Sequence, residues 1–270
     1  MLKKCLKHEW KASWKHMALL NGAAVFMGIL GGLGILFSMH WNLPDLLVVL
    51  YIVAYILVLL GSAVMTTILM IQRYYKNLFT DQGYLTNVLP VSATDQILSK
   101  LLVFAIWSIL NGICLLLSVG FLFLPAAIEY FTTTSVSFAD FWNFGWTQLS
   151  CILKVAFDLL GLTNLAGRIL YTILGFLAST GFNILLIYAS ISIGSLISGH
   201  KILAAVLTYL AATTLIQIFS GLGVVTVFQS STPHAMITVS SLFFLLLTVV
   251  LDIVLFLICR YILSRRLNLA

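Results

Sequence analysis

Charged residues are scarce in this sequence, and their scarcity excludes an ordinary soluble domain. Asp, Glu, Lys and Arg make up 8% of the 270 residues, whereas soluble domains carry about 25%. Hydrophobic residues make up 61%, and the mean hydropathy is +1.12. Together with several apolar runs of roughly 20 residues, these values predict an all-α integral membrane protein, and the length suits one helical membrane domain.

Motifs for catalysis, metal binding and nucleotide binding are also absent. The four cysteines form no CxxC pair, and there is no HExxH, nucleophile elbow or pair of carboxylates. The nearest approach to a phosphate-binding loop is GSLISGHK (194–201). There His200 stands where the motif needs lysine, and the stretch ends a predicted span. We therefore predict no catalytic, cofactor or metal site in this chain, and no enzymatic activity of its own.

Long apolar runs predict six membrane-spanning helices. Each run is long enough to cross about 30 Å of hydrocarbon as a helix. The four prolines fall between the runs or at their ends, where proline does not disrupt a helix. We expect the first run to be a retained span, since it is too long for a signal peptide. The runs cover residues 17–39, 46–72, 99–124, 168–197, 202–228 and 235–259.

The stretch TQLSCILKVAFDLLGL (147–162) is ambiguous, and we assign it to the outer membrane surface. As a seventh span it would bury Lys154 and Asp158, at about 2.5–3.5 kcal/mol each. These two residues are four apart and share one helix face, while the opposite face is apolar. The pattern predicts an amphipathic helix lying on the outer interface.

The basic residues predict the orientation of the chain. With six spans and both termini in the cytoplasm, 12 of the 14 Lys and Arg lie on the cytoplasmic side. Only Lys154 and Arg168 lie outside, as the positive-inside rule favours. The formal net charge of +6 therefore reflects topology, and we expect no nucleic-acid partner.

The N-terminal segment MLKKCLKHEWKASWKHM predicts an amphipathic helix over residues 1–16, before the six-span domain at 17–270. Its five lysines fall within an arc of about 120°, flanked by Trp10 and Trp14. One interpretation is a helix on the membrane surface, held by anionic lipid and tryptophan anchoring. The other is an elbow helix that also touches a cytoplasmic partner, with Glu9 as one contact.

The stretch RYYKNLFTDQGYLTNVLPVSATDQILSK (73–100) is the longest hydrated segment. Its residues 73–98 are a predicted cytoplasmic loop between the second and third spans. Asp81 and Gly83 suit a turn. Ser92 and Asp95 form a capping box at the start of the next helix. Exposed apolar residues on this loop predict a docking surface. They are Tyr84, Leu85, Val88 and Leu89.

A family resemblance rests on this same loop. YKNLFTDQGYLTNVLPVSATDQILSKLL resembles a segment of bacterial ABC-2-type transporter permeases of low-GC Gram-positive organisms, close to F-x-K-x-L-F-x-D-E-G-Y-L-x-x-x-L-P-V-S and then S-K-L-L. YASISIGSLISGHK (188–201) is similar to the family's small-residue fourth span and short loop. The resemblance covers essentially the whole chain, and residues 73–102 are its specific part. Gln82 stands where the family commonly has Glu, which removes one charge.

The resemblance implies a permease subunit of an ABC exporter in the bacterial cytoplasmic membrane. Two such subunits, identical or related, would form the pathway, and separate ATPase subunits that bind ATP and Mg would dock on the loop. The implied coupling residues are Asp81, Gly83, Tyr84, Leu85, Leu89 and Pro90, with His200 and Lys201 of the SGHK turn as a second contact.

Polar stripes mark two of the predicted spans. In the family, spans two and five line the pathway, so the resemblance implies a lining role for both stripes. The alternative is interhelical hydrogen bonding, worth about 0.6 kcal/mol per contact. The residues are Tyr51, Tyr55, Ser62 and Thr66 on span two, and Tyr209, Thr213 and Gln217 on span five.

Two further features lie within the spans. Asp252 in the sixth span is either a functional carboxylate or a structural one that is neutral or paired with a neighbouring helix. Gly28 and Gly32 form a GxxxG pair, which predicts close helix packing.

Three functions compete for this sequence. The first is an export permease, for which amphiphilic peptides, drugs and lipids are all compatible substrates. The second is a membrane-embedded enzyme, which the missing catalytic constellation disfavours. The third is a non-transporting membrane anchor or sensor that recruits a cytoplasmic partner through the loop.

The predicted orientation can be tested by cysteine labelling in a variant that lacks the native cysteines. A cysteine at Thr80 should be protected from a membrane-impermeant maleimide in intact cells, because it lies in the cytoplasm. A cysteine at Thr133 should be labelled from outside. External labelling at position 80 would overturn the orientation and the docking argument with it.

Overall fold

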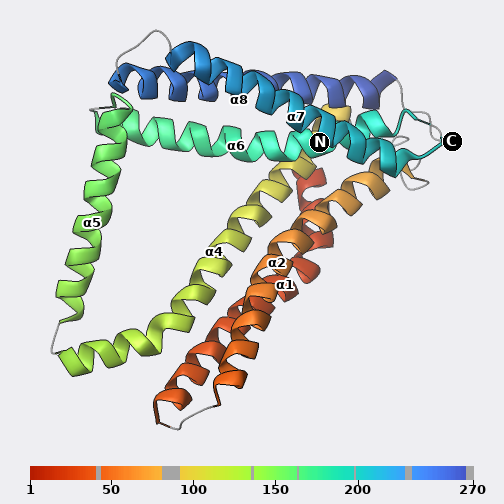
Figure 1. The fold of residues 1–270 in the computed structure, drawn as a ribbon. Coiled ribbons are helices and arrows are strands. Elements are labelled where there is room, and N and C mark those ends of the chain that lie inside the picture. Colours follow the sequence, from red (N-terminus) through yellow and green to blue (C-terminus); the bar gives the residue numbers. More distant parts are fainter. Residues whose placement is uncertain are drawn as a thin grey trace. The chain divides into compact units, whose positions relative to one another are not determined.

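The computed structural model of the chain is built from α-helices joined by turns (Figure 1). It describes residues 1–40, 44–80, 92–134, 137–162, 164–197, 199–228 and 233–265. Within these ranges there are seven helices and no strand. They are α1 (Leu2–His40), α2 (Asp45–Phe79), α4 (Ala93–Thr134), α5 (Phe138–Leu159), α6 (Leu165–Gly194), α7 (Lys201–Phe228) and α8 (Pro233–Arg265).

Six of these helices are long and apolar enough to cross a membrane. The remaining helix, α5, is not among them, so the described residues agree with six spans and no seventh at 147–162. This confirms a multi-pass membrane protein, while the side on which each terminus lies stays a prediction. The spans are Leu2–Ser38, Asp45–Phe79, Ala93–Thr134, Leu165–Gly194, Lys201–Gly221 and Val239–Ser264.

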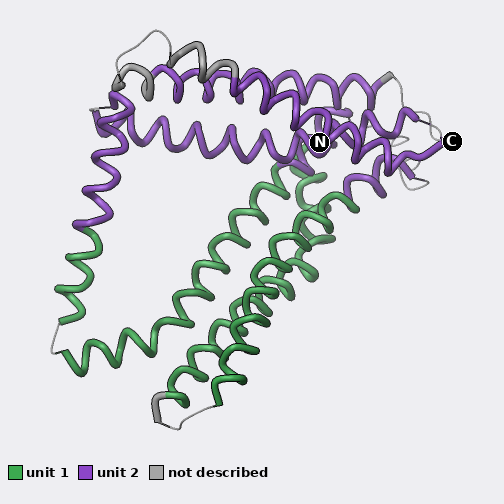
Figure 2. Tube along the Cα trace, in the orientation of Figure 1, with its two compact units in different colours: residues 1–72, 102–146 green, residues 73–101, 147–270 purple. Residues whose placement is uncertain are grey.

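The chain divides into two compact units (Figure 2). Unit 1 comprises residues 1–72 and 102–146, and unit 2 comprises residues 73–101 and 147–270. The boundaries fall inside α2, α4 and α5, so each of these helices contributes to both units. The units are described one at a time.

In unit 1, polar and aromatic contacts join α1 to α4. The indole Nε1 of Trp107 donates to Ser13 Oγ over 3.1 Å, and the ring of Trp107 stacks on Trp10 with centroids 4.7 Å apart. Further along, Asn111 Nδ2 donates to Asn21 Oδ1 over 2.7 Å. Because Trp107, Ser13, Asn111 and Asn21 are all buried, the two hydrogen bonds satisfy polar atoms that would otherwise have no partner.

These contacts explain why a separate elbow helix at 1–16 is not confirmed. The helix α1 runs without a break from Leu2 to His40. Ser13 and Met17, on either side of the expected boundary, are 2% and 1% exposed. The stack of Trp10 on Trp107 therefore continues the packing of α1 into its first turns. The five lysines at positions 3, 4, 7, 11 and 15 are exposed.

The GxxxG prediction is confirmed by the approach of α1 to α4. A Cβ atom added to Gly28 would overlap the carbonyl oxygen of Ser118, and one added to Gly32 would lie 2.5 Å from the carbonyl oxygen of Phe121. Both neighbours are backbone atoms, which cannot swing away as a flexible side chain can. Only residues without a side chain permit this spacing.

One expectation from the sequence is wrong, because Pro125 lies inside α4 and not at a span end. Proline lacks the N–H that would bond to the carbonyl four residues back. That carbonyl belongs to Phe121, against which Gly32 of α1 packs. The neighbouring helix thus covers the freed oxygen, which is how membrane helices tolerate an internal proline.

The helix expected at 147–162 begins earlier, at Phe138, and ends at Leu159. Its start is explained by Ser137, whose Oγ accepts the N–H of Ala139 over 3.2 Å. A serine that accepts such a bond supplies a helix N-cap. The sequence at 138–146 is rich in aromatic residues, and it forms one continuous helix with residues 147–159.

In unit 2, α6 packs against both α7 and α8 (Figure 1). Small residues set the contact with α7. A Cβ atom added to Gly194 would lie 2.5 Å from the backbone nitrogen of Ala205. The hydroxyl of Thr208 lies 3.1 Å from the carbonyl oxygen of Ser190. The end of α6 and the start of α7 are therefore in close backbone contact.

The Gly28 contact makes a stability prediction with a matched control. Gly28→Ala should lower the thermal unfolding temperature of the detergent-purified chain, because overpacking costs about 1–3 kcal/mol. Gly34→Ala should leave it unchanged or raise it, since nothing lies within 4 Å of the added Cβ and alanine is the better helix former. Equal unfolding temperatures for the two variants would contradict the packing described here.

Candidate functional site

The end of α2 that leads toward the predicted coupling loop packs against the end of α6. The ring of Tyr74 stacks on that of Tyr188, with centroids 3.8 Å apart and planes 4° from parallel. The hydroxyl of Tyr74 lies 3.0 Å from Ser192 Oγ. The hydroxyl of Ser192 donates its own hydrogen to the carbonyl oxygen of Tyr188 over 2.8 Å. Tyr74 is therefore the donor in its bond to Ser192.

Helix α8 joins the same contact. The thiol of Cys259 lies next to the side chains of Tyr74 and Ser192. These residues and Tyr188 are no more than 1% exposed. We call Tyr74, Tyr188, Ser192 and Cys259 the tyrosine cluster. It ties α2, α6 and α8 together at one place in unit 2.

The start of α4 brings the chain back from the predicted loop. The N–H of Asp95 donates to Ser92 Oγ over 3.1 Å, which confirms Ser92 as the predicted N-cap. Behind this cap, Ile97, Ser99 and Lys100 are all buried. Together with the burial of the α2 end, this holds both stems of the loop within unit 2.

The second predicted contact follows the end of α6. The carbonyl oxygen of His200 accepts the N–H of Ala204 over 2.9 Å at the start of α7. His200 is exposed and Lys201 is half-buried. Because Tyr74 and Ser192 are hydrogen-bonded, the two predicted contact segments follow helix ends that lie together.

Most of the predicted coupling residues lie outside the residues that the structure describes. Of the others, His200 and Lys201 lie as described above, and Glu9 is half-buried in α1. Their contact with an ATPase stays a prediction. The residues outside the described ranges are Asp81, Gly83, Tyr84, Leu85, Leu89 and Pro90, together with Ser198 of the SGHK turn.

The tyrosines of the predicted span-two stripe are engaged in packing within unit 1. Tyr55 donates to Ser118 Oγ over 3.0 Å, since the Ser118 hydroxyl itself donates to the carbonyl oxygen of Ala24 at 2.6 Å. The hydroxyl of Tyr51 donates to the carbonyl oxygen of Met27. These bonds are of the interhelical kind that the alternative interpretation of the stripe expected.

The serine and threonine residues of both stripes donate hydrogen bonds to carbonyl oxygens of their own helices. Ser62 and Thr66 of α2 are each 4% exposed and donate to backbone carbonyl oxygens within α2. In α7, Thr213 is half-buried and donates to the carbonyl oxygen of Tyr209 over 3.0 Å. Tyr209 and Gln217 are exposed. A pathway lining by either stripe stays a prediction.

Asp252 of α8 faces α6 at Gly181. A Cβ atom added to Gly181 would lie 3.4 Å from Asp252 Oδ2. Its other oxygen, Oδ1, is buried without a hydrogen-bond partner among the described residues. The same residues contain no group of three His, Cys, Asp or Glu side chains able to hold a metal. Both interpretations of Asp252, functional and structural, therefore stand.

Comparisons with protein-family models, with curated proteins and with solved structures found no match to this chain. Sequence reasoning missed the tyrosine cluster, whose Tyr74 and Ser192 are 118 positions apart. The available signal was weak. A tyrosine near a span end, and Ser190 and Ser192 near another, are polar groups that need hydrogen-bond partners. No local sequence pattern shows that Tyr74 is the partner of Ser192.

The hydrogen bond of Tyr74 to Ser192 can be measured with a double-mutant cycle. Tyr74→Phe removes the donor and Ser192→Ala removes the acceptor, so each should lower the free energy of unfolding by about 0.5–1.5 kcal/mol. The double variant should lose less than the two losses added together, by about 1 kcal/mol. Unfolding of the detergent-purified chain supplies the measurement.

Tyr75→Phe is the matched control for this cycle. Tyr75 neighbours Tyr74 on α2, and its ring stacks on Phe79 without use of the hydroxyl. Removal of this hydroxyl should leave the unfolding free energy unchanged. Additive losses in the cycle, or an equal loss in the control, would show that the bond does not hold α2 to α6.

Proposed function

We propose that this chain is the permease subunit of an ABC exporter in the bacterial cytoplasmic membrane. It would form the translocation pathway with a second permease subunit, identical or related. A separate ATPase subunit would bind ATP and Mg and dock on residues 81–90. The six helices long enough to span a membrane fit this role, and the loop sequence is its specific support.

The structural observation that supports the proposal is the tyrosine cluster. A coupling loop must pass a displacement of the ATPase to the membrane helices, so its stems need rigid attachment. The α2 stem is fixed to α6 and α8 by a buried ring stack and a buried hydrogen bond. Fully packed aromatic contacts of this kind resist independent movement of their helices.

The second contact segment strengthens this support. The end of α6 bears Ser192 of the cluster and then Gly194, whose close approach fixes the start of α7. A displacement of the 81–90 loop by the ATPase and a displacement of the 198–201 turn would therefore both be passed to the same packed end of unit 2.

A double variant in the loop tests the proposal. Leu85→Ala with Leu89→Ala should keep normal membrane insertion, because neither leucine lies in a predicted span. It should lose co-purification with the ATPase that the wild-type chain captures. It should also lose stimulation of ATP hydrolysis in reconstituted vesicles, because the truncated side chains would no longer fill an apolar groove on the ATPase beside the aromatic anchor Tyr84.

The control is Thr86→Ala with Asn87→Ala, which truncates the polar residues between the two leucines. This variant should bind and stimulate the ATPase like the wild type. If the leucine variant also does so, residues 81–90 are not the coupling element. If the wild-type chain captures an ATPase without any effect on hydrolysis or transport, the chain is an anchor and the exporter proposal fails.

A further inference from the structure

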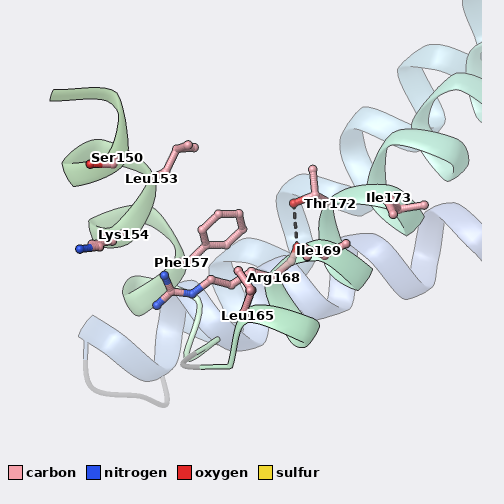
Figure 3. Close-up of a pocket in the computed structure, with 9 residues that line it drawn as sticks. All are labelled: Ser150, Leu153, Lys154, Phe157, Leu165, Arg168, Ile169, Thr172 and Ile173. Atoms are coloured by element: carbon pink, nitrogen blue, oxygen red, sulfur yellow. Dashed lines mark hydrogen bonds between the residues drawn. The ribbon is translucent and has the colours of Figure 1, made fainter. Parts of the chain in front are cut away.

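A pocket of about 360 Å³ lies between α5 and α6, entirely within unit 2 (Figure 3). Its lining comes from residues 150–157 of α5 and 165–173 of α6. Pockets that hold small ligands measure about 300–1,000 Å³. None of the predicted coupling or pathway residues lies in it, so the pocket needs an explanation of its own.

Most of the lining is apolar and open to the surroundings. Leu153, Leu165, Ile169 and Ile173 are each at least 43% exposed, and the half-buried ring of Phe157 stands between the two helices (Figure 3). Such a surface in water would be costly, at about 25 cal/mol for each Å² left uncovered. An acyl chain would cover it at no cost in polar contacts.

The lining also includes two cations, Lys154 of α5 and Arg168 of α6. In Figure 3 the ammonium of Lys154 points away from α6, at the outer side of α5. The two residues are the only Lys or Arg between Lys100 and Lys201. Two basic residues that are isolated in a stretch of 100 positions are thus brought to one pocket by the turn between α5 and α6. That both residues line one pocket is a property of the fold.

The turn that joins α5 to α6 fixes the position of Arg168. Gly161 has a φ of 69°, and the N–H of Leu162 donates to the carbonyl oxygen of Phe157 over 2.9 Å, which is a Schellman helix end. The carbonyl oxygen of Leu162 then accepts Arg168 Nε over 2.7 Å. Arg168 Nη2 donates to Asp158 Oδ1 over 2.8 Å.

The charges at the pocket do not cancel. Asp158 balances Arg168, and Lys154 makes no ion pair or hydrogen bond with the rest of the chain that the structure describes. One positive charge is therefore left over beside an apolar wall. Arginine carries five N–H donors, and the two bonds of Arg168 to Leu162 and Asp158 leave donors available to a further oxygen ligand.

We propose that this pocket binds an anionic phospholipid of the surrounding bilayer. One acyl chain lies along the wall of Leu153, Ile169 and Ile173, and the phosphate is held by Lys154 and Arg168. The location favours a membrane lipid, because Arg168 stands in the first turn of a helix long enough to span the membrane. Basic side chains at that depth meet lipid headgroups. The proposal does not depend on the exporter function.

The test uses the full-length chain in vesicles that contain phosphatidylglycerol or phosphatidylcholine with the same photoreactive acyl chain. Crosslinked lipid is mapped by mass spectrometry to peptides of the chain. Phosphatidylglycerol should label residues 150–173 several-fold more than phosphatidylcholine. Lys154→Gln should reduce this preference roughly fivefold, as expected for one cation near an anionic headgroup.

Two further variants separate the headgroup site from general effects. Lys76→Gln removes an exposed lysine outside the pocket and should leave the labelling of 150–173 unchanged. Ile169→Asn should reduce labelling by both lipids, because it disrupts the acyl wall and not the charge. Equal labelling by the two lipids, or a preference that survives Lys154→Gln, would overturn the proposal. Labelling confined to the lysine-rich start of α1 would overturn it as well.

Discussion

Buried polar groups in a membrane span have no water to bond, so each must find its partner within the chain. Here one solution recurs three times. A serine hydroxyl donates to a backbone carbonyl oxygen and accepts a hydrogen bond from an aromatic side chain of another helix. Serine suits this position because it has one donor and two lone pairs. The aromatic–serine pairs are Trp107–Ser13, Tyr55–Ser118 and Tyr74–Ser192.

These three pairs set which helices stay together. The first two hold α1, α2 and α4 in unit 1, and the third holds the end of α2 to α6 in unit 2. The glycine contacts work with them, because Gly28 lies against Ser118, the serine that accepts from Tyr55. The close backbone approach of α1 to α4 and the hydrogen bond from Tyr55 of α2 thus both involve Ser118. The α2 stem of the predicted coupling loop is held to α6 by the third pair.

The sequence predicts well those features that depend on local composition. Six runs of apolar residues are enough to give six spans, and Ser92 is enough to give the cap of α4. The sequence predicts poorly those features that depend on a neighbouring helix. The interior position of Pro125 requires Gly32 to cover the Phe121 carbonyl, and the continuity of α1 through its first turns requires Trp107. The tyrosine cluster needs residues more than a hundred positions apart, which no periodicity reveals.

Lys154 and Arg168, which line the same pocket, differ in what they contribute to the fold. From the sequence they are the two exceptions to a cytoplasmic set of basic residues. In the structure Arg168 caps a turn carbonyl and pairs with Asp158, and its guanidinium lies 5.5 Å from the centroid of the Phe157 ring. That position follows from the α5–α6 turn and not from orientation in the membrane. Lys154 has no such structural task, so the charge that it adds beside an apolar wall is available for a ligand.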